Sequence, residues 1–261
     1  MCFNARHLIE TMMMRAIQRG DETTTHEARL LLKNYGIDNL FQVSGFAHPG
    51  MVIYTNNAPF NPLPSVWGLV PEWAKSPESI WNSTLNARGE TVFEKPAFKK
   101  SAETKRCLIP ADGFYDFHHF RGKKYPFYIF PKNQKPIYFA GLWNDWKNSD
   151  TGEILNTYSI VTTKANELMA KIHNKPKFSN DPRMPVILPE NLADEWLKPL
   201  QKKELQELAT FVFPDSQLDA HTVRKLTGKG SPGNVPDANK KHSYDELVFD
   251  DEKGSQLRLF P

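Results

Sequence analysis

The chain is poor in cysteine: its 261 residues include only Cys2 and Cys107. Two cysteines exclude a framework of several disulfides, and they exclude a zinc site made of four cysteines. No run of about 18 apolar residues occurs, so no membrane-spanning segment is predicted. The N-terminal stretch carries Glu10, Arg15 and Arg19 where a secretory signal peptide would have an apolar core. These absences predict a cytoplasmic protein that has no contact with a membrane.

A large excess of charge of one sign is also missing. The chain has 33 Lys and Arg against 30 Asp and Glu, a formal net charge of +3. This balance permits contact with nucleic acid without demanding it. The hydrophobic content of 39% is enough for a proper core, and the 20 prolines predict many loops. Because the end of the chain is rich in Gly, Pro, Asn and Lys and then acidic, we expect a folded domain over residues 1–227 and a partly packed or disordered extension over 228–261.

Apolar periodicity predicts both helices and strands. We expect helices over 21–35, with Thr24 or Thr25 as the cap, over 191–200 and 203–211, and a short one that ends at His173. Strands are expected over 43–46, 51–54, 126–130, 136–143, 158–161 and 183–188, and two more around the turn Ala111-Asp112-Gly113. The centre of the chain is therefore β-rich.

The second residue offers unusual chemistry. The aminopeptidase that removes initiator methionine prefers a small second residue, so we expect Met1 to be removed. Cys2 then carries an α-amine and a thiol on adjacent carbons, which condense with an aldehyde to an imine and then to a five-membered thiazolidine. Reference pKa values of about 8 for the amine and about 8.5 for the thiol keep both usable near neutral pH. A cysteine after methionine more often has no function, so the other motifs must decide.

Two tryptophans lie close together in the segment Val66 to Ala74. We expect Trp67 to belong to the core. Trp73 follows Pro71 on a loop and is expected at the surface, where an indole that stacks on a base contributes roughly 1–3 kcal/mol.

The segment Asn86-Ala87-Arg88-Gly89-Glu90-Thr91 has no apolar periodicity. One interpretation is a polar turn with an internal pair between Arg88 and Glu90. The other is a site loop in which Asn86 fixes a small polar group and Arg88 binds a phosphate.

Two titratable residues are candidates for acid–base chemistry. Asp116 lies between Tyr115 and Phe117, and an acid among aromatic residues tends to have a raised pKa, as a proton donor at neutral pH requires. The strand alternation equally allows Asp116 to face solvent. His173 ends a helix, where the macrodipole favours the cation, and a histidine there is more often a cap than a catalyst.

Taken together, these segments resemble the SRAP family, the SOS response-associated peptidases, which are also described as abasic-site processing proteins. The resemblance spans Cys2 to about Leu200. The matching segments, in the family's order, are Met-Cys at the start, Trp-Gly-Leu-Val-Pro-Glu-Trp-Ala, Asn-Ala-Arg-Gly-Glu-Thr, Arg-Cys-Leu-Ile-Pro-Ala-Asp-Gly-Phe-Tyr-Asp-Phe, and Val-Thr-Thr with Ile-His and Arg-Met-Pro-Val-Ile-Leu. The resemblance implies a mixed α+β fold around a β-barrel-like core, with a positively charged groove.

The resemblance also implies a function. Family members crosslink to abasic sites in single-stranded DNA through the mature N-terminal cysteine, in the response to DNA damage. For this chain it implies a lyase-like monomer without cofactor or metal, in the cytoplasm and on the nucleoid after damage. The implied catalytic residues are Cys2 as nucleophile, Asn86 orienting its amine, Asp116 in place of the family's glutamate, and His173. The implied DNA contacts are Trp73, Arg88, Pro49 and Thr162.

The chain departs from the family pattern at three places. Phe3 stands where the family has glycine, which crowds the backbone beside Cys2. Asp116 is one methylene shorter than glutamate, a loss of about 1.5 Å of reach, so its role requires a backbone shift or a bridging water. An insertion of roughly Lys175 to Pro182 separates His173 from Arg183.

Two other functions remain open from the sequence. One is a thiol autopeptidase, a hydrolase in which Cys2, His173 and Asp116 remove Met1. The other is a non-catalytic reader of modified DNA that uses the same groove. A test of a Cys2→Ala variant on abasic DNA distinguishes covalent crosslinking from non-covalent binding by such a reader.

Overall fold

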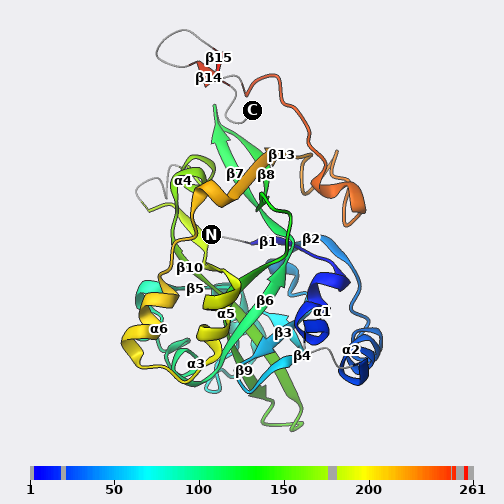
Figure 1. Ribbon diagram of the computed structural model, residues 1–261, viewed down its shortest axis with the longest axis vertical. Helices are drawn as coiled ribbons and strands as arrows, with labels where there is room; N and C mark the ends of the chain where they lie inside the picture. Colours follow the sequence, from blue (N-terminus) through cyan, green and yellow to red (C-terminus); the bar gives the residue numbers. More distant parts are fainter. Residues whose placement is uncertain (1–2, 19–21, 176–180, 248, 251–255, 258–261) are drawn as a thin grey trace.

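The computed structural model describes residues 3–18, 22–175, 181–247, 249–250 and 256–257. A β-barrel and a second β-sheet lie end to end, and helices cover two flanks of the barrel (Figure 1). This arrangement confirms the predicted α+β fold with a β-barrel-like core.

Strands β3, β4, β6, β9 and β10 close the barrel. Strand β3 pairs with β4 and β6, β9 pairs with β6 and β10, and β10 returns to β4 in parallel through Tyr158 and Trp67. The bounds are β3 Gly50–Thr55, β4 Ala58–Trp67, β6 Arg106–Ala111, β9 Ile137–Lys147 and β10 Ile154–Lys164. Three short strands extend the barrel wall: β5 (Asn86–Arg88) and β11 (Arg183–Pro185) on β10, and β12 (Ile187–Leu188) on β9.

The second sheet has the strand order β13-β8-β7-β1-β2. Its members are β1 (Asn4–His7), β2 (Leu40–Ser44), β7 (Gly113–Phe120), β8 (Lys123–Pro131) and β13 (Leu218–Thr222). The two strands expected around Ala111-Asp112-Gly113 exist, but β6 lies in the barrel and β7 in this sheet. A Cβ atom at Gly113 would lie 2.5 Å from the carbonyl oxygen of Ile129, so only glycine fits where the chain crosses between sheets.

One apolar core joins the two sheets. Phe114 and Phe127 of the second sheet pack in the same cluster as Ile53, Trp67 and Phe139 of the barrel. Trp67 is fully buried, as predicted, and its indole N–H donates to the carbonyl of Leu85 at 2.8 Å. The shared core holds β7, which carries Asp116, rigidly on the barrel.

The helices flank the barrel on two sides (Figure 1). Helices α1 (Ile9–Gln18) and α2 (Glu22–Asn34) lie on one side, and α3 (Lys99–Thr104), α5 (Glu190–Leu197) and α6 (Lys202–Ala209) on the other. Helix α2 confirms the helix predicted over 21–35 and ends before Gly36, whose φ is +61°. Thr24 and Thr25 lie inside α2, so neither is its cap. No helix in the described part of the chain is long and apolar enough to cross a membrane.

The segment after Gly228 returns to the second sheet. Lys241 forms a β-bridge with Val223, and the side-chain oxygen of Asn234 accepts hydrogen bonds from the backbone of Phe41 and Gln42. A 3-10 turn at Pro236–Asn239 lies against β2. Strands β14 (Phe249–Asp250) and β15 (Gln256–Leu257) pair with each other. The described part of the predicted extension is therefore packed against the second sheet at Asn234, Pro236–Asn239 and Lys241.

Candidate functional site

A pocket of about 310 Å³ opens where β1, the β7–β8 hairpin and α4 (Glu167–Ile172) meet. Phe3 lines the pocket and directly follows Cys2, which lies outside the described residues. Strand β1 pairs with β7 so that Asn4 lies opposite Tyr115, next to Asp116. The lining residues are Phe3, Asn4, Phe46, Tyr115, Asp116, Phe117, His119, Lys124, His173 and Lys175.

Asp116 and His173 form a buried pair in this pocket. They are 6% and 8% exposed, and Oδ2 of Asp116 lies 2.9 Å from Nδ1 of His173. The second carboxylate oxygen accepts a hydrogen bond from the backbone N–H of Phe117 at 2.8 Å. Both carboxylate oxygens of Asp116 thus accept a hydrogen bond, and the contact with Nδ1 fixes the orientation of the His173 ring. The alternative in which Asp116 faces solvent is wrong.

Helix α4 is fastened to β7 at several points, which brings His173 to Asp116. The side chain of Asn166 caps the helix by accepting from the backbone of Met169 at 2.9 Å. His118 on β7 donates through Nδ1 to the carbonyl of Lys171 at 2.8 Å. The side-chain amide of Asn174 makes two bonds to the backbone of His119, at 2.7 and 3.0 Å. The contact between Asp116 and His173 is therefore direct and needs no bridging water, although an aspartate side chain is one methylene shorter than a glutamate side chain.

Phe3 forms an aromatic part of the pocket. Its ring centroid lies 4.9 Å from that of Phe46, which is 54% exposed. Phe3 is thus packed against Phe46, and both rings line the pocket.

The pocket also contains three basic side chains, of which the sequence analysis singled out none as a site residue. His119 lies on β7, Lys124 on β8, and Lys175 just after α4. Burial, followed by the charges of Lys124 and Lys175, lowers the pKa of His119. The signal in the sequence is the His118-His119 pair, which follows Asp116 in the same strand.

The polar segment 86–91 forms pairs other than the predicted internal one. Arg88 bonds to Asp181 at 2.5 Å, and its side chain is 50% exposed. Glu90 instead accepts two bonds of 2.7 Å from Arg183. Burial acts to raise the pKa of Glu90, but the hydrogen bonds and charge of Arg183 outweigh it and hold this pKa below its usual value. Arg183 is buried and structural, whereas Arg88 remains at the surface.

The remaining predicted residues lie in different environments. Asn86 begins β5, pairs with Ile160 of β10, and is not among the residues that line the pocket. Trp73 is 62% exposed, as expected. Pro49 is partly buried and accepts a bond from the backbone of Trp67 at 3.2 Å.

Thr162 lies in the interior. It is fully buried in β10, between β5 and β11, and its hydroxyl donates to the carbonyl of Ala87 at 3.3 Å. The structure therefore does not present this side chain to a ligand. Among the described residues, no group of three or more His, Cys, Asp or Glu side chains is placed to hold a metal ion.

The sequence of the chain is similar to those of known proteins. The profile of the family described as SOS response associated peptidase (SRAP) matches residues 40–229. Abasic site processing protein YoqW of Bacillus subtilis (strain 168) is 40% identical over 179 residues, which cover 67% of this chain and 75% of that protein. Abasic site processing protein HMCES of Pongo abelii is 28% identical over 204 residues, which cover 67% of this chain and 55% of that protein.

A solved structure also matches. The crystal structure of a protein from Bacteroides thetaiotaomicron has a TM-score of 0.80 and 31% identity, and the match covers 93% of this chain and 100% of that one. Asp116 and His173 lie within the residues matched by the family profile, and Cys2 precedes them.

Proposed function

Because the chain belongs to the SRAP family, we propose that it crosslinks covalently to abasic sites in single-stranded DNA through Cys2, after removal of Met1. The observation that carries this proposal is the buried Asp116–His173 pair in a pocket that Phe3 also lines. One residue of extended chain spans about 3.5 Å, so the residue before Phe3 is within reach of the pocket.

The proposed reaction needs one acid and balances with the loss of water. The amine of Cys2 attacks the C1′ aldehyde of the opened abasic sugar. The resulting hydroxyl leaves as water after it takes a proton from Nε2 of protonated His173, while Asp116 holds the ring through Nδ1. The thiol then adds to the carbon of the resulting iminium, its proton returns to Nε2 of His173, and a neutral thiazolidine results. Positioning the amine beside the aldehyde supplies a large part of the acceleration.

Trp73 and Arg88 are the proposed DNA contacts outside the pocket. Both side chains are exposed, and an indole and a guanidinium suit stacking on a base and binding a phosphate. The role of Asn86 in orienting the Cys2 amine stays a prediction carried by the family resemblance.

The test combines a denaturing gel with an intact-mass measurement. We expect a heat-stable adduct whose mass equals the protein without Met1 plus the abasic oligonucleotide minus one water. Cys2→Ala should abolish the adduct. Cys107→Ala is the matched control and should leave it unchanged, since Cys107 is fully buried and burial raises the pKa of its thiol.

Other outcomes would contradict the proposal. Crosslinking by protein that retains Met1 would exclude the amine mechanism, because the nitrogen of Cys2 would then be an amide. Tight binding without any adduct would favour the non-catalytic reader. Loss of Met1 that stops in the Cys2→Ala variant, without any adduct, would favour the autopeptidase.

A further inference from the structure

We infer that His119, Lys124 and Lys175 form a subsite for a phosphate that flanks the abasic sugar. The inference rests on the proposed function, because it names the part of the DNA that enters the same pocket beside the reacting aldehyde.

Three separate elements contribute to this subsite. His119 and Lys124 are direct cross-strand partners in the β7–β8 hairpin, and Lys175 reaches the pocket from the end of α4. Residues directly opposite each other on adjacent strands have Cβ atoms about 4.5–5.5 Å apart, and like charges placed this way destabilise a sheet. A histidine opposite a lysine, with a second lysine lining the same pocket, is therefore an arrangement that a bound anion would stabilise.

The charge of Lys124 is not neutralised by a carboxylate of the described lining residues. Asp116 is the only acidic residue among the described lining residues, and its two oxygens accept from His173 and from the backbone of Phe117. Lys124 makes no salt bridge to any carboxylate of the described chain, and its ammonium lies 5.9 Å from the centre of the Phe117 ring. The positive charge of Lys124 thus remains available to a ligand.

The imidazole of His119 adds a nitrogen that has no hydrogen-bond partner among the described residues. Its Nδ1 is buried and makes no hydrogen bond to any described residue. Burial lowers its pKa first, the charges of Lys124, Lys175 and His118 lower it further, and Asp116 acts in the opposite direction. A bound anion would raise this pKa, so binding takes up a proton and strengthens as the pH falls.

The chemistry of the substrate identifies the anion. An abasic nucleotide has no base, so the phosphates on either side of the sugar are its charged groups. A pocket of about 310 Å³ is at the lower end of the range for small-molecule sites, about 300–1,000 Å³. It suits a sugar with an attached phosphate, and charge-assisted bonds from lysine and histidine are the usual means of holding a phosphate.

The experiment removes charge from the DNA in one arm and from the protein in the other. Initial crosslinking rates are measured at limiting protein with two abasic oligonucleotides, one with normal phosphates and one with neutral methylphosphonates on both sides of the lesion. We expect the neutral linkages to slow the parent protein by about tenfold, as the loss of one charge-assisted contact would. The Lys124→Gln/Lys175→Gln double variant should be slow with both substrates and indifferent to the methylphosphonates.

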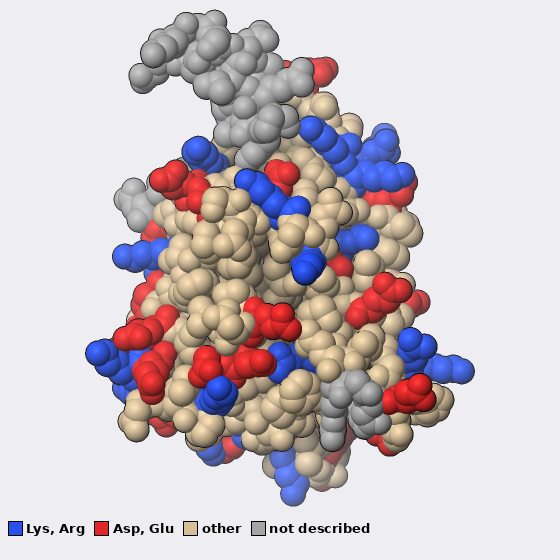
Figure 2. All heavy atoms as spheres, viewed as in Figure 1, with Lys and Arg blue, Asp and Glu red and all other residues tan. Residues whose placement is uncertain are grey.

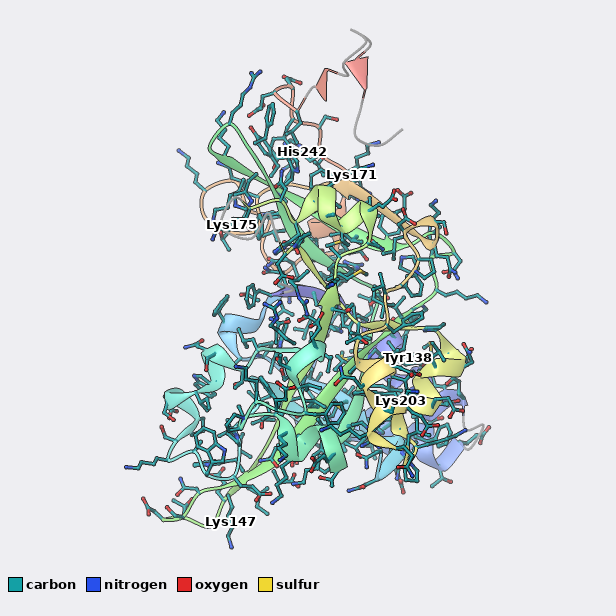
Figure 3. All side chains as sticks on the ribbon, turned by 90° about the vertical axis from the view of Figure 1, so that its left-hand side faces the viewer. Tyr138, Lys147, Lys171, Lys175, Lys203 and His242 are labelled. Atoms are coloured by element: carbon teal, nitrogen blue, oxygen red, sulfur yellow. The ribbon has the colours of Figure 1, made fainter. Side chains whose placement is uncertain are left out.

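Lys147→Gln is the matched control. Figure 3 shows Lys147 at the lower end of the molecule and Lys175 in its upper half, so this variant removes a charge far from the pocket and should behave as the parent. A ratio of the two rates near one in the parent protein, or an unchanged ratio in the double variant, would overturn the subsite. Failure of every protein to crosslink either oligonucleotide would instead refute the proposed function.

A pH series tests His119 separately. The rate with normal phosphates is divided by the rate with methylphosphonates. Because both substrates undergo the same chemical step, its pH dependence cancels in this ratio. We expect this ratio to grow from pH 8 to pH 6 in the parent and to stay flat in His119→Gln. A parent ratio that does not change with pH would remove His119 from the subsite.

Discussion

At the scale of single residues, Asp116 holds the ring of His173 through the contact between Oδ2 and Nδ1. Asp116→Asn keeps an oxygen that accepts from Nδ1 but removes the negative charge that stabilises the imidazolium. We expect crosslinking to slow by at least about tenfold, within the range for general acid catalysis, while the affinity for intact single-stranded DNA stays the same. Gel-based rates from pH 5 to 8 and a binding titration measure the two effects.

Asp219 provides a matched control for this substitution. Its Oδ1 also accepts from the next backbone N–H, here that of Ala220 at 2.7 Å, but its side chain is exposed on β13. Asp219→Asn should therefore crosslink at the parental rate. A parental rate for Asp116→Asn as well would leave Asp116 with a purely structural role.

Substitutions of Arg88 and of Asp181 are predicted to have opposite effects on the affinity for DNA. An exposed ion pair contributes only about 0–1 kcal/mol, so DNA phosphate can replace Asp181 at little cost. Arg88→Ala should weaken binding to intact and abasic strands alike and lower the salt dependence by about one phosphate. Asp181→Asn should strengthen binding, because it frees the guanidinium. Salt-dependent titrations of both variants check this, and equal effects of the two substitutions would place Arg88 outside the DNA interface.

Single positions were predictable where local chemistry decided them. The loop that Pro71 predicts was enough to expect Trp67 in the core and Trp73 at the surface, where the structure has them. Thr162 was not predictable in this way, because its burial depends on β5 and β11, which flank β10 from distant parts of the sequence. The pocket residues His119 and Lys124 become neighbours only through the register of β7 and β8.

At the scale of elements, the attachment of α4 to β7 sets the geometry of the site. Asn174→Ala removes two side-chain bonds to the backbone of His119, each worth about 1 kcal/mol. We expect crosslinking to slow several-fold and α4 amides to exchange faster, with a small loss of overall stability. Asn148→Ala is the control, since its side chain accepts two backbone bonds in the distant β9–β10 turn. Equal rates in both variants would show that this attachment does not position His173.

Most elements followed from periodicity, but their partners did not. The strands now seen as β6 and β7 were predictable one by one, whereas their assignment to two different sheets depends on pairings with β9 and β8. Strand β4 contains Pro59, Pro62 and Pro64, which argue against a strand. It tolerates them because it pairs with β10 only at its end, near Trp67. Helix α1 was not predicted, although its buried Met12, Met13 and Ala16 follow the helical spacing.

At the scale of the whole molecule, net charge says little about where DNA binds. Figure 2 shows acidic and basic side chains mixed on one face, with acidic ones gathered over α5 and α6. Glu190, Asp194 and Glu195 of α5 belong to this region. The pocket that holds Lys124 and Lys175 lies on different elements. The composition gives the small positive total but does not reveal that acidic side chains gather over α5 and α6 while Lys124 and Lys175 line the pocket.

His7 links the two sheets and makes the stability of the molecule depend on pH. It lies fully buried in β1 and donates through Nδ1 to the carbonyl of Pro110 in β6 at 2.7 Å. Burial lowers its pKa from 6.5 to about 4, against a smaller opposing effect of the bond to Pro110. The unfolded chain therefore binds a proton between about pH 6.5 and 4 that the folded chain does not, so acidification through this window favours unfolding.

The size of this effect can be measured against a variant that does not titrate. A shift of this magnitude corresponds to about 3 kcal/mol of unfolding free energy lost on going from pH 7 to pH 4. His7→Asn keeps an amide N–H close to the position of Nδ1 but does not titrate. The unfolding free energy that this variant loses between pH 7 and pH 4 should therefore be about 3 kcal/mol smaller than the loss in the parent. Urea unfolding at both pH values gives the four free energies, and other groups that titrate cancel in the comparison. Parallel pH profiles for the two proteins would mean that His7 can take up its proton inside the folded molecule.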